Sequence, residues 1–264
     1  MVAVTSRRPA RPRVPAWTVL VYYLTNYRRT WRAGLFSSFF LPLLTVVGFG
    51  LGVGSYVDQG LDGVSYLYWI VPGLLLAGIL QVAVLESTFP VFSGFQWSKI
   101  YFGQYAAPLR VGDIVAGHLA FVVFRVLTAA IAFLLVTAAF GALRSFWAVA
   151  VLPVIVLFTL AMITPIFAFS ASVPTDTHLT ILFRFAVLPM TLFSGVFFPV
   201  ESLPTGLRQV AYLSPLWHAV DLCRAATLGM APQWSIVGHL LYLAAWAVVG
   251  WVLARRAFRR RLVV

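Results

Sequence analysis

The run Ile114–Phe140, IVAGHLAFVVFRVLTAAIAFLLVTAAF, decides the class of this protein. It is longer than the roughly 20 apolar residues that cross a bilayer as a helix, and Arg125 is its one charged side chain. Further stretches of the same character are residues 35–56, 69–91, 146–171, 180–199 and 234–254. We therefore predict an all-α, polytopic membrane protein with six transmembrane helices.

The composition supports this prediction. The chain is 61% hydrophobic and 10% charged, whereas soluble domains are roughly 45–50% apolar and about a quarter charged. This apolar surplus is too large for one soluble core, because a soluble protein must also cover its surface with polar groups. The composition thus excludes a soluble enzyme, a nucleic-acid-binding protein and a disordered regulator.

The distribution of the 19 basic residues predicts how the chain is oriented. With the N-terminus inside, seven arginines precede the first span, Lys99 and Arg110 follow the second, and five arginines lie in the C-terminal segment 255–264. The outer segments then hold only Arg144, Arg208 and Arg224. Positive residues gather on the cytoplasmic side, so we predict a plasma-membrane protein with both termini in the cytoplasm.

The segments outside the spans divide the chain further. Residues 1–14 are rich in Arg and Pro and predict a disordered basic tail. Residues 15–34 place Trp17, Leu20 and Leu24 on one helical face, which predicts an amphipathic helix in the membrane interface. This helix is either a simple anchor or part of a docking surface. The membrane domain then covers residues 35–254, and residues 255–264 form a basic cytoplasmic C-terminus.

The inner loop between the second and third spans predicts a short amphipathic helix. The aromatic and aliphatic residues that share one face of Phe95–Tyr105 are Trp97, Ile100, Tyr101 and Tyr105, with Lys99 off that face. Residues 107–113 then break the helix before the third span. Such a helix on the membrane rim suits a socket for another protein, and an interfacial connector without a partner is the alternative.

The outer segment 194–226 predicts a re-entrant helical hairpin. One short helix covers about 203–212, and a second begins at Ser214 with Pro215 in its first turn. On the second helix His218, Asp221 and Arg224 recur every three residues, so they can interact along one face. They form either an outer gate that contacts a substrate headgroup or a local network that holds the hairpin together.

Ionisable residues within the spans are costly unless they face the bundle interior or water. These residues are Glu86, Arg125 and Arg184. From their expected depths we predict that Glu86 pairs with Arg184 and that Arg125 faces a polar cavity or a substrate phosphate. The alternative is a purely structural ion pair with a snorkelling arginine.

The chain lacks the sequence patterns of ATP binding, catalysis, metal binding and ion-coupled transport. A phosphate-binding loop ends in Gly-Lys-Ser/Thr, but the lone lysine, Lys99, lies between Ser98 and Ile100. The acids and histidines lack catalytic or metal-ligand spacing, and Cys223 has no second cysteine to pair with. An ion-coupled carrier would bury paired acids, and only Glu86 comes close. We therefore expect no enzyme, no cofactor and no bound metal.

Two stretches resemble a known family. Residues 193–204, FSGVFFPVESLP, and 213–225, LSPLWHAVDLCRA, are similar to the signature of type-2 ABC exporter permeases, most of all the permeases of nodulation lipo-oligosaccharide exporters. Residues 108–118, PLRVGDIVAGH, also resemble that subgroup. His118 departs from the acidic residue expected there. The resemblance covers essentially the whole chain.

The resemblance implies half of an export channel. A second permease, identical or related, would pair with this chain, and two copies of a cytoplasmic ABC ATPase would bind ATP and magnesium. The implied substrates are amphiphiles such as lipo-oligosaccharides or lipid-linked glycans, or else hydrophobic drugs. It places ATPase coupling in the first inner loop and the exit at the outer hairpin. The hairpin residues concerned are Phe197, Phe198, Pro199, Glu201, Trp217, His218, Asp221 and Arg224.

Overall fold

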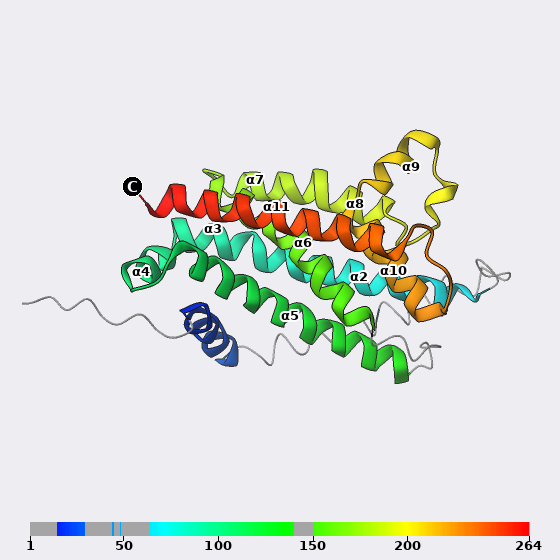
Figure 1. Cartoon of the computed structure of the whole chain (residues 1–264), viewed down its shortest axis with the longest axis horizontal. Helices are drawn as coiled ribbons and strands as arrows, with labels where there is room; N and C mark the ends of the chain where they lie inside the picture. The colour runs from blue at the N-terminus through cyan, green and yellow to red at the C-terminus, as the bar shows by residue number, and fades with distance from the viewer. Residues whose placement is uncertain (1–14, 30–43, 45–47, 49–63, 140–149, 264) are drawn as a thin grey trace, which may run out of the picture.

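The computed structural model describes residues 15–29, 44, 48, 64–139 and 150–263, and these ranges are helical with no β-strand (Figure 1). The predicted tail and nearly all of the predicted first span lie outside the described residues. Four described segments are long and apolar enough to cross a membrane. They are α2 with α3 (Tyr66–Gln96), α5 (Val111–Ala139), α6 (Val151–Ser172) and α11 (Ile236–Leu262). Four of the six predicted spans are therefore confirmed as helices of membrane-spanning length.

The predicted fifth span is a shorter, interrupted helix. It consists of α7 (Thr177–Leu182), the π-helical turn η3 (Phe183–Val187) and α8 (Leu188–Phe193). The helix ends at Phe193, before the predicted end at Pro199, and the chain continues through bends to Pro199. A π turn has i→i+5 hydrogen bonds and is a rare interruption that occurs mostly as a single turn within an α-helix. The segment is apolar but falls below the length of the four longer spans.

The cytoplasmic-loop prediction of one continuous amphipathic helix over Phe95–Tyr105 is wrong. Within this stretch α3 (Phe89–Gln96) ends at Gln96, and α4 (Ile100–Ala106) begins only at Ile100. Between them Lys99 has a positive φ of 51°, the left-handed conformation that interrupts a helix. The predicted break before the third span is confirmed, since α4 ends at Ala106 and α5 begins at Val111.

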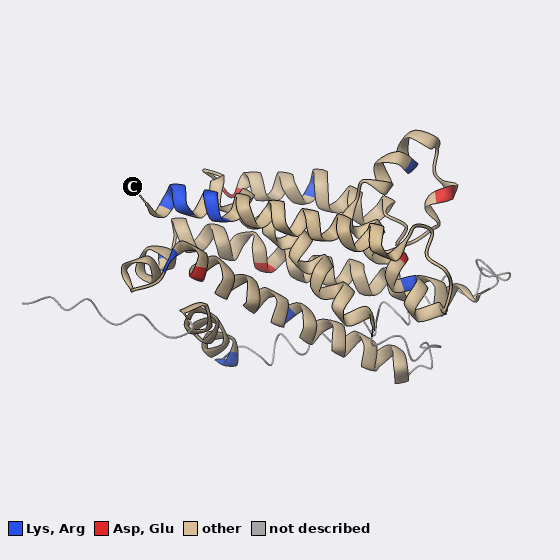
Figure 2. Ribbon diagram, viewed as in Figure 1, with Lys and Arg blue, Asp and Glu red and all other residues tan. Residues whose placement is uncertain are grey.

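The C-terminal basic segment is helical over most of its length. Helix α11 continues from the membrane-spanning stretch through the arginines and ends at Leu262. Figure 2 shows these arginines gathered on the last turns of α11. The helix of residues 15–29 lies beside α5 at the same end of the molecule as α4 (Figure 1).

The long helices lie side by side along the long axis of the molecule (Figure 1). Helix α6 lies at the centre of this bundle, where it packs against α2, α5, α10 and α11. Its contact with α11 is close because Gly250 faces Thr164 and Pro165, and a Cβ at that position would lie 2.2 Å from Thr164 Oγ1. Small residues allow such close helix contacts in membranes.

The residues 15–29 helix is held against α5 in a similar way. A Cβ at Gly117 would lie 2.5 Å from Cβ of Val19 and 2.6 Å from the carbonyl oxygen of Ala16. Val19 is consequently buried. A helix is present over residues 15–29 of the predicted segment, and Val19 packs it on α5, whereas Trp17 of the predicted apolar face is 58% exposed.

Two short helices lie at the end of the molecule away from α4 (Figure 1). They are α9 (Thr205–Tyr212) and α10 (Pro215–Leu228), preceded by the 3₁₀ turn η4 (Val200–Ser202). The predicted start of the second helix is confirmed, because the Ser214 side chain accepts a hydrogen bond from the backbone N–H of Leu216. Helix α10 is largely buried, and it packs against α2, α6 and α11.

Candidate functional site

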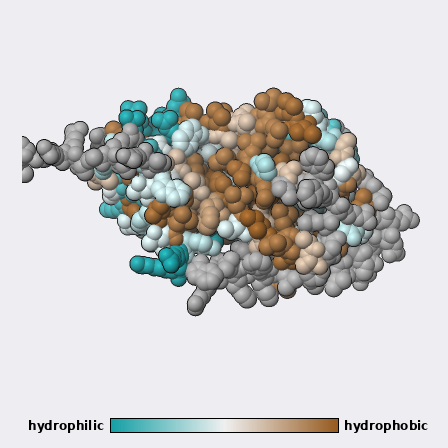
Figure 3. Space-filling model, turned by 60° about the horizontal axis from the view of Figure 1, so that its bottom comes forward, coloured by the Kyte–Doolittle hydropathy of each residue, from teal (hydrophilic) through white to brown (hydrophobic). Residues whose placement is uncertain are grey.

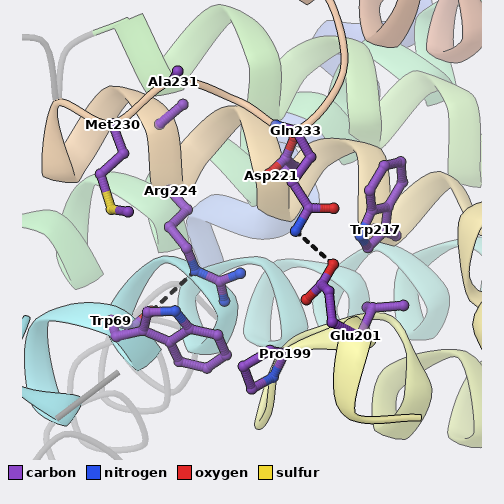
Figure 4. Close-up of a pocket in the computed structure, with 11 residues that line it drawn as sticks. Trp69, Pro199, Glu201, Trp217, Asp221, Arg224, Met230, Ala231 and Gln233 are labelled. Carbon is purple, nitrogen blue, oxygen red and sulfur yellow. Dashed lines mark hydrogen bonds between the residues drawn. The ribbon is translucent and has the colours of Figure 1, made fainter. Parts of the chain in front are cut away.

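A small pocket lies where α2, α10 and the η4 turn meet (Figure 4). Its volume is about 70 Å³, well below the roughly 300–1,000 Å³ of drug-sized ligand pockets. The pocket can therefore hold one polar group or a few waters, but not a whole sugar residue. The residues that line it are Trp69, Pro199, Val200, Glu201, Trp217, Asp221, Arg224, Ala225, Met230, Ala231 and Gln233.

Arg224 connects three segments at this pocket. Its guanidinium lies 3.7 Å from the centroid of the Trp69 ring, and its Nε donates to the carbonyl oxygen of Trp69 over 3.3 Å. Its Nη2 donates to the carbonyl oxygen of Gly195 over 2.8 Å. A guanidinium on an indole face combines a cation–π contact with directed hydrogen bonds. Arg224 thereby ties α10 to the start of α2 and to the turn before η4.

Gln233 closes the opposite wall of the pocket. Its side-chain Nε2 donates to Oε1 of Glu201 over 2.7 Å, and its backbone N–H donates to Oδ2 of Asp221 over 2.8 Å. Figure 4 shows Glu201 and Gln233 meeting across the pocket. The pocket thus combines aromatic faces, one guanidinium and two carboxylates, which are the groups that recognise polar headgroups.

The pocket brings together only part of the predicted hairpin set. Pro199, Glu201, Trp217, Asp221 and Arg224 line it. The other three predicted residues lie beside it. The carbonyl oxygen of Phe197 accepts a hydrogen bond from the Tyr66 hydroxyl, the Phe198 side chain packs on the small cluster around Trp217, and His218 faces α11.

The predicted interaction of His218, Asp221 and Arg224 along one helix face takes a different form. His218 and Asp221 are joined through His239 of α11, because the two Nδ1 atoms lie 2.8 Å apart and Nε2 of His239 lies 3.0 Å from Oδ2 of Asp221. Arg224 points instead to Trp69 and Gly195. The spacing of three residues placed all three groups on α10, but α11 and α2 supply their partners.

The hydrogen bonds of His218 determine where its proton lies. Nε2 faces the carbonyl oxygen of Tyr212 over 3.0 Å, and a carbonyl can only accept. Nε2 therefore carries the proton, which leaves Nδ1 of His218 as the nitrogen that faces Nδ1 of His239 at 2.8 Å. Burial, reinforced by the nearby His239, lowers the pKa of His218 to about 4. His218 is thus neutral at pH 7 and serves as a buried joint between α10 and α11.

The predicted pairing of Glu86 with Arg184 is wrong. Nε of Arg125 donates to Oε1 of Glu86 over 3.0 Å, and the two side chains are 14% and 23% exposed. The guanidinium of Arg125 also lies 4.5 Å from the centroid of the Tyr27 ring. The pair forms because α3 extends the α2 segment to Gln96, which places Glu86 deeper in the membrane segment than the sequence indicated.

Arg184 was predicted as a buried charge, but it is exposed on the η3 turn. Its neighbours on that side, Ile181, Phe185 and Leu188, are exposed as well. The π turn rotates the helix by an amount that an α-helical pattern does not anticipate. Arg184 therefore does not belong to the interior of the single chain.

The predicted coupling residues separate into two groups. Trp97 is 61% exposed, and Lys99 and Tyr105 are exposed beside it, whereas Ile100 is half-buried. Phe102, which the sequence analysis did not select, is exposed on the same segment. Trp97, Phe102 and Tyr105 therefore offer exposed aromatic surface at the α4 end of the molecule.

Tyr101 belongs to the core instead. It is fully buried, and its hydroxyl lies 2.7 Å from Nδ1 of His118 on α5. Burial raises the pKa of Tyr101 well above its usual range, so the phenol keeps its proton for this hydrogen bond. Its ring also packs edge-on against Phe258 of α11, 5.0 Å between centroids. Tyr101 thus ties α4 to α5 and α11.

The described residues hold no group of three His, Cys, Asp or Glu side chains placed to bind a metal ion. Residues 16–228 match the sequence model of the ABC-2 type transporter family, which is most of the chain. The chain belongs to the ABC-2 type transporter family. This family forms the membrane component of ABC transporters rather than a catalytic domain, and the resemblance seen in the sequence is thereby confirmed.

This ABC-2 chain is similar to nodulation proteins over nearly its whole length. It is 27% identical to Nodulation protein J of Rhizobium meliloti over 250 residues, 94% of this chain and 95% of that protein. It is 27% identical to Nodulation protein J of Sinorhizobium fredii over 259 residues, 97% and 96% of the two chains. It is 25% identical to the inner membrane transport permease YadH of Escherichia coli over 239 residues, 88% and 91%.

Several residues in and beside the pocket at α10 were not identified from the sequence. Trp69, Met230 and Gln233 line the pocket, and His239 joins His218 to Asp221. The sequence contained no signal for these pairings, because the partners lie on α2, on α11 and in the connection between α10 and α11. The contact of Tyr27 with Arg125 had a weak signal, since Tyr27 follows Leu20 and Leu24 at helical spacing.

Proposed function

We propose that this ABC-2 chain is the permease subunit of an ATP-driven exporter that moves an amphiphile, a lipo-oligosaccharide or lipid-linked glycan, outward across the plasma membrane. The observation that carries the proposal is the Trp69–Arg224 contact in the pocket beside α10. Because the Trp69 ring is buried under the guanidinium, the half-buried Arg224 is the group that binds one phosphate or carboxylate of the headgroup. The full-length similarity to Nodulation protein J supports a glycan-bearing cargo.

The charge distribution supports an orientation with the α10 end outside. The arginines of α11 lie at the end of the molecule where α4 lies, whereas α10, which lines the pocket, lies at the other end (Figures 1 and 2). Positive residues favour the cytoplasmic side. The pocket then opens near the outer surface, where it serves as an exit contact for the polar headgroup and not as a binding pocket for the whole substrate.

The energy for transport comes from a partner in this proposal. The chain has no Gly-Lys-Ser/Thr sequence, so ATP and magnesium bind to two copies of a separate cytoplasmic ABC ATPase. The exposed aromatics Trp97, Phe102 and Tyr105 are the docking surface. A second permease subunit, identical or related, completes the channel. Tyr101 carries the motion of α4 to α5 and α11 through its contacts with His118 and Phe258.

Substrate-stimulated ATP hydrolysis tests this proposal. The permease is co-expressed with a candidate ABC ATPase from the same organism, and the purified complex is placed in lipid nanodiscs. Lipid-linked oligosaccharide, an anthracycline and the carrier lipid alone are added in turn. We expect the lipid-linked oligosaccharide to stimulate ATP hydrolysis, and neither of the other two compounds to do so. Stimulation by the anthracycline alone would support a drug exporter instead, and failure of the two proteins to co-purify would contradict the ATP-driven mechanism.

Cysteine labelling tests the orientation separately. Native Cys223 is fully buried, which keeps the background low. Thr205→Cys on α9 and Gly103→Cys on α4 are both at exposed positions. In intact cells an impermeant maleimide should label the cysteine at position 205 and reach position 103 only after permeabilisation. The reverse labelling pattern would show that the α9 end faces the cytoplasm and the α4 end faces outside.

A further inference from the structure

An apolar groove runs along the surface between α5, α6 and α11. Its volume is about 470 Å³, and its walls include Leu119, Val123, Leu160, Val248 and Trp251. Thr164 is the one hydroxyl-bearing residue in its lining, and that hydroxyl already donates to backbone carbonyl oxygens within the bundle. The lining of the groove is therefore almost wholly apolar and can accommodate a hydrocarbon chain.

A basic pocket follows the groove along α11. It has a volume of about 210 Å³, and it is formed by Arg255, Arg256 and Arg259 with Val111 and Val252. All three arginines are exposed. Within the described residues none of them has a carboxylate partner, and the guanidinium of Arg255 lies 5.8 Å from the centroid of the Trp251 ring. The pocket therefore presents an uncompensated positive charge.

The two features form one continuous surface. Residues 247, 248 and 251 line the groove, and residues 252, 255, 256 and 259 line the basic pocket, so they occupy one stripe of α11. Trp251 stands at the junction beside Arg255. Figure 3 shows a broad hydrophobic surface with the most hydrophilic described residues gathered toward one end.

The dimensions of this surface match one membrane leaflet. At 1.5 Å per residue, the stripe descends about 12 Å from Arg255 to Ala247. Half of the hydrocarbon core is about 15 Å thick. A lipid with its phosphate at the arginines therefore has most of one acyl chain alongside the groove. Basic pockets between transmembrane helices on the cytoplasmic side bind anionic headgroups in other membrane proteins.

We propose that this surface is a binding site for an anionic phospholipid of the inner leaflet. Arg255, Arg256 and Arg259 hold the headgroup phosphate, and one acyl chain lies in the groove between α5, α6 and α11. The site is separate from the pocket beside α10 and does not depend on which substrate is exported. It fastens the cytoplasmic end of α11, which also contacts Tyr101 through Phe258.

Native mass spectrometry of the purified full-length protein tests the site. The probes are phosphatidylglycerol, phosphatidylcholine with the same acyl chains, and inorganic phosphate. We expect the parent to bind phosphatidylglycerol at least about tenfold more tightly than phosphatidylcholine. Arg255→Gln, Arg256→Gln and Arg259→Gln should each weaken binding about fivefold, and the triple variant at least about tenfold. Arg260→Gln, on the same helix but outside the pocket, is the matched control and should bind like the parent.

A second variant tests the groove without changing any charge. Ala120→Trp places a large ring in the groove and should also weaken phosphatidylglycerol binding, whereas Leu253→Trp, at an exposed position outside it, should not. Unchanged binding in the triple arginine variant or in Ala120→Trp would overturn the proposal. So would equal binding of phosphatidylcholine, or full displacement of the lipid by equimolar inorganic phosphate. A shift of Ala120→Trp from dimer to monomer with lipid binding intact would identify the groove as a subunit interface instead.

Discussion

The guanidinium of Arg224 lies 3.7 Å from the centroid of the Trp69 ring, although 155 residues separate the two along the chain. The contact joins α10 to the beginning of α2. Because the same guanidinium also holds the Gly195 carbonyl, one side chain fixes three segments around the pocket. Trp69 is only 1% exposed, so this arrangement is part of the packed structure and not a loose surface contact.

We predict that Arg224→Lys impairs transport by at least about tenfold at equal membrane levels of the permease. Lysine keeps the charge but cannot reproduce the planar contact with Trp69 together with two directed hydrogen bonds, and hydrogen bonds from charged groups contribute about 1.5–3 kcal/mol. Arg260→Lys is the control, because Arg260 is exposed near the C-terminal end of α11 and lies outside the pocket lining. Transport at the parental rate in Arg224→Lys would exclude a role for the pocket.

A second prediction concerns the ion pair between Glu86 and Arg125. Glu86→Gln should lower the free energy of unfolding by about 3 kcal/mol, because breaking a buried pair leaves an uncompensated charge. The exchanged variant, Glu86→Arg with Arg125→Glu, should recover part of that loss. Arg184→Gln should have little effect, because Arg184 is exposed on η3. Thermal unfolding in detergent measures all four proteins, and equal midpoints for all would refute the pair.

The sequence predicted most helices but few of their side-chain partners. The apolar runs located the spans now seen as α2–α3, α5, α6 and α11, and the Ser214–Pro215 pair located the start of α10. A hydropathy pattern indicates the length of a span but not the depth of each residue within it. The predicted depth of Glu86 relative to Arg125 was therefore wrong. Helical spacing likewise assigned Tyr101 to an exposed face, because the left-handed turn at Lys99 has no periodic signal. The Trp69–Arg224 contact depends on packing between distant helices and lay beyond the sequence.

The buried joint between α10 and α11 makes stability depend on pH. The pKa of His218 is lowered to about 4 in the fold, compared with roughly 6.5 in an unfolded chain. The unfolded chain therefore binds a proton that the folded chain excludes, so the stabilisation is complete above pH 6.5 and is lost as the pH falls from about 6.5 to about 4.

We expect the unfolding midpoint of the parent to fall more steeply over that window than the midpoint of His218→Gln, which cannot titrate. Expressed as the free energy of unfolding against pH, the slopes of the two proteins should differ by up to about 1.4 kcal/mol per pH unit. Measurements at pH 7.5, 6.5, 5.5 and 4.5 in the same detergent decide the point. Parallel pH profiles for the two proteins would show that His218 is not the group responsible.

A further prediction concerns how the α4 end of the molecule binds the ATPase and couples ATP hydrolysis to transport. Replacing both Trp97 and Tyr105 with Ala should weaken binding of the ATPase by about 2 kcal/mol or more, because large exposed aromatics dominate protein interfaces. Tyr101→Phe should keep ATPase binding, since Tyr101 is buried, but it should lower transport per ATP hydrolysed through loss of the hydrogen bond to His118. Co-purification and coupled transport separate the two effects. Full ATPase retention in the double variant would move the docking surface to the helix of residues 15–29.

In the proposed mechanism this ABC-2 chain exports its substrate with energy from a separate ATPase. The most direct measurement is uptake of lipid-linked oligosaccharide into inside-out vesicles that contain the permease with or without that ATPase. We predict uptake only when both proteins and hydrolysable ATP are present, and none with a non-hydrolysable analogue. Uptake by the permease alone, driven by a proton or sodium gradient without ATP, would contradict this account.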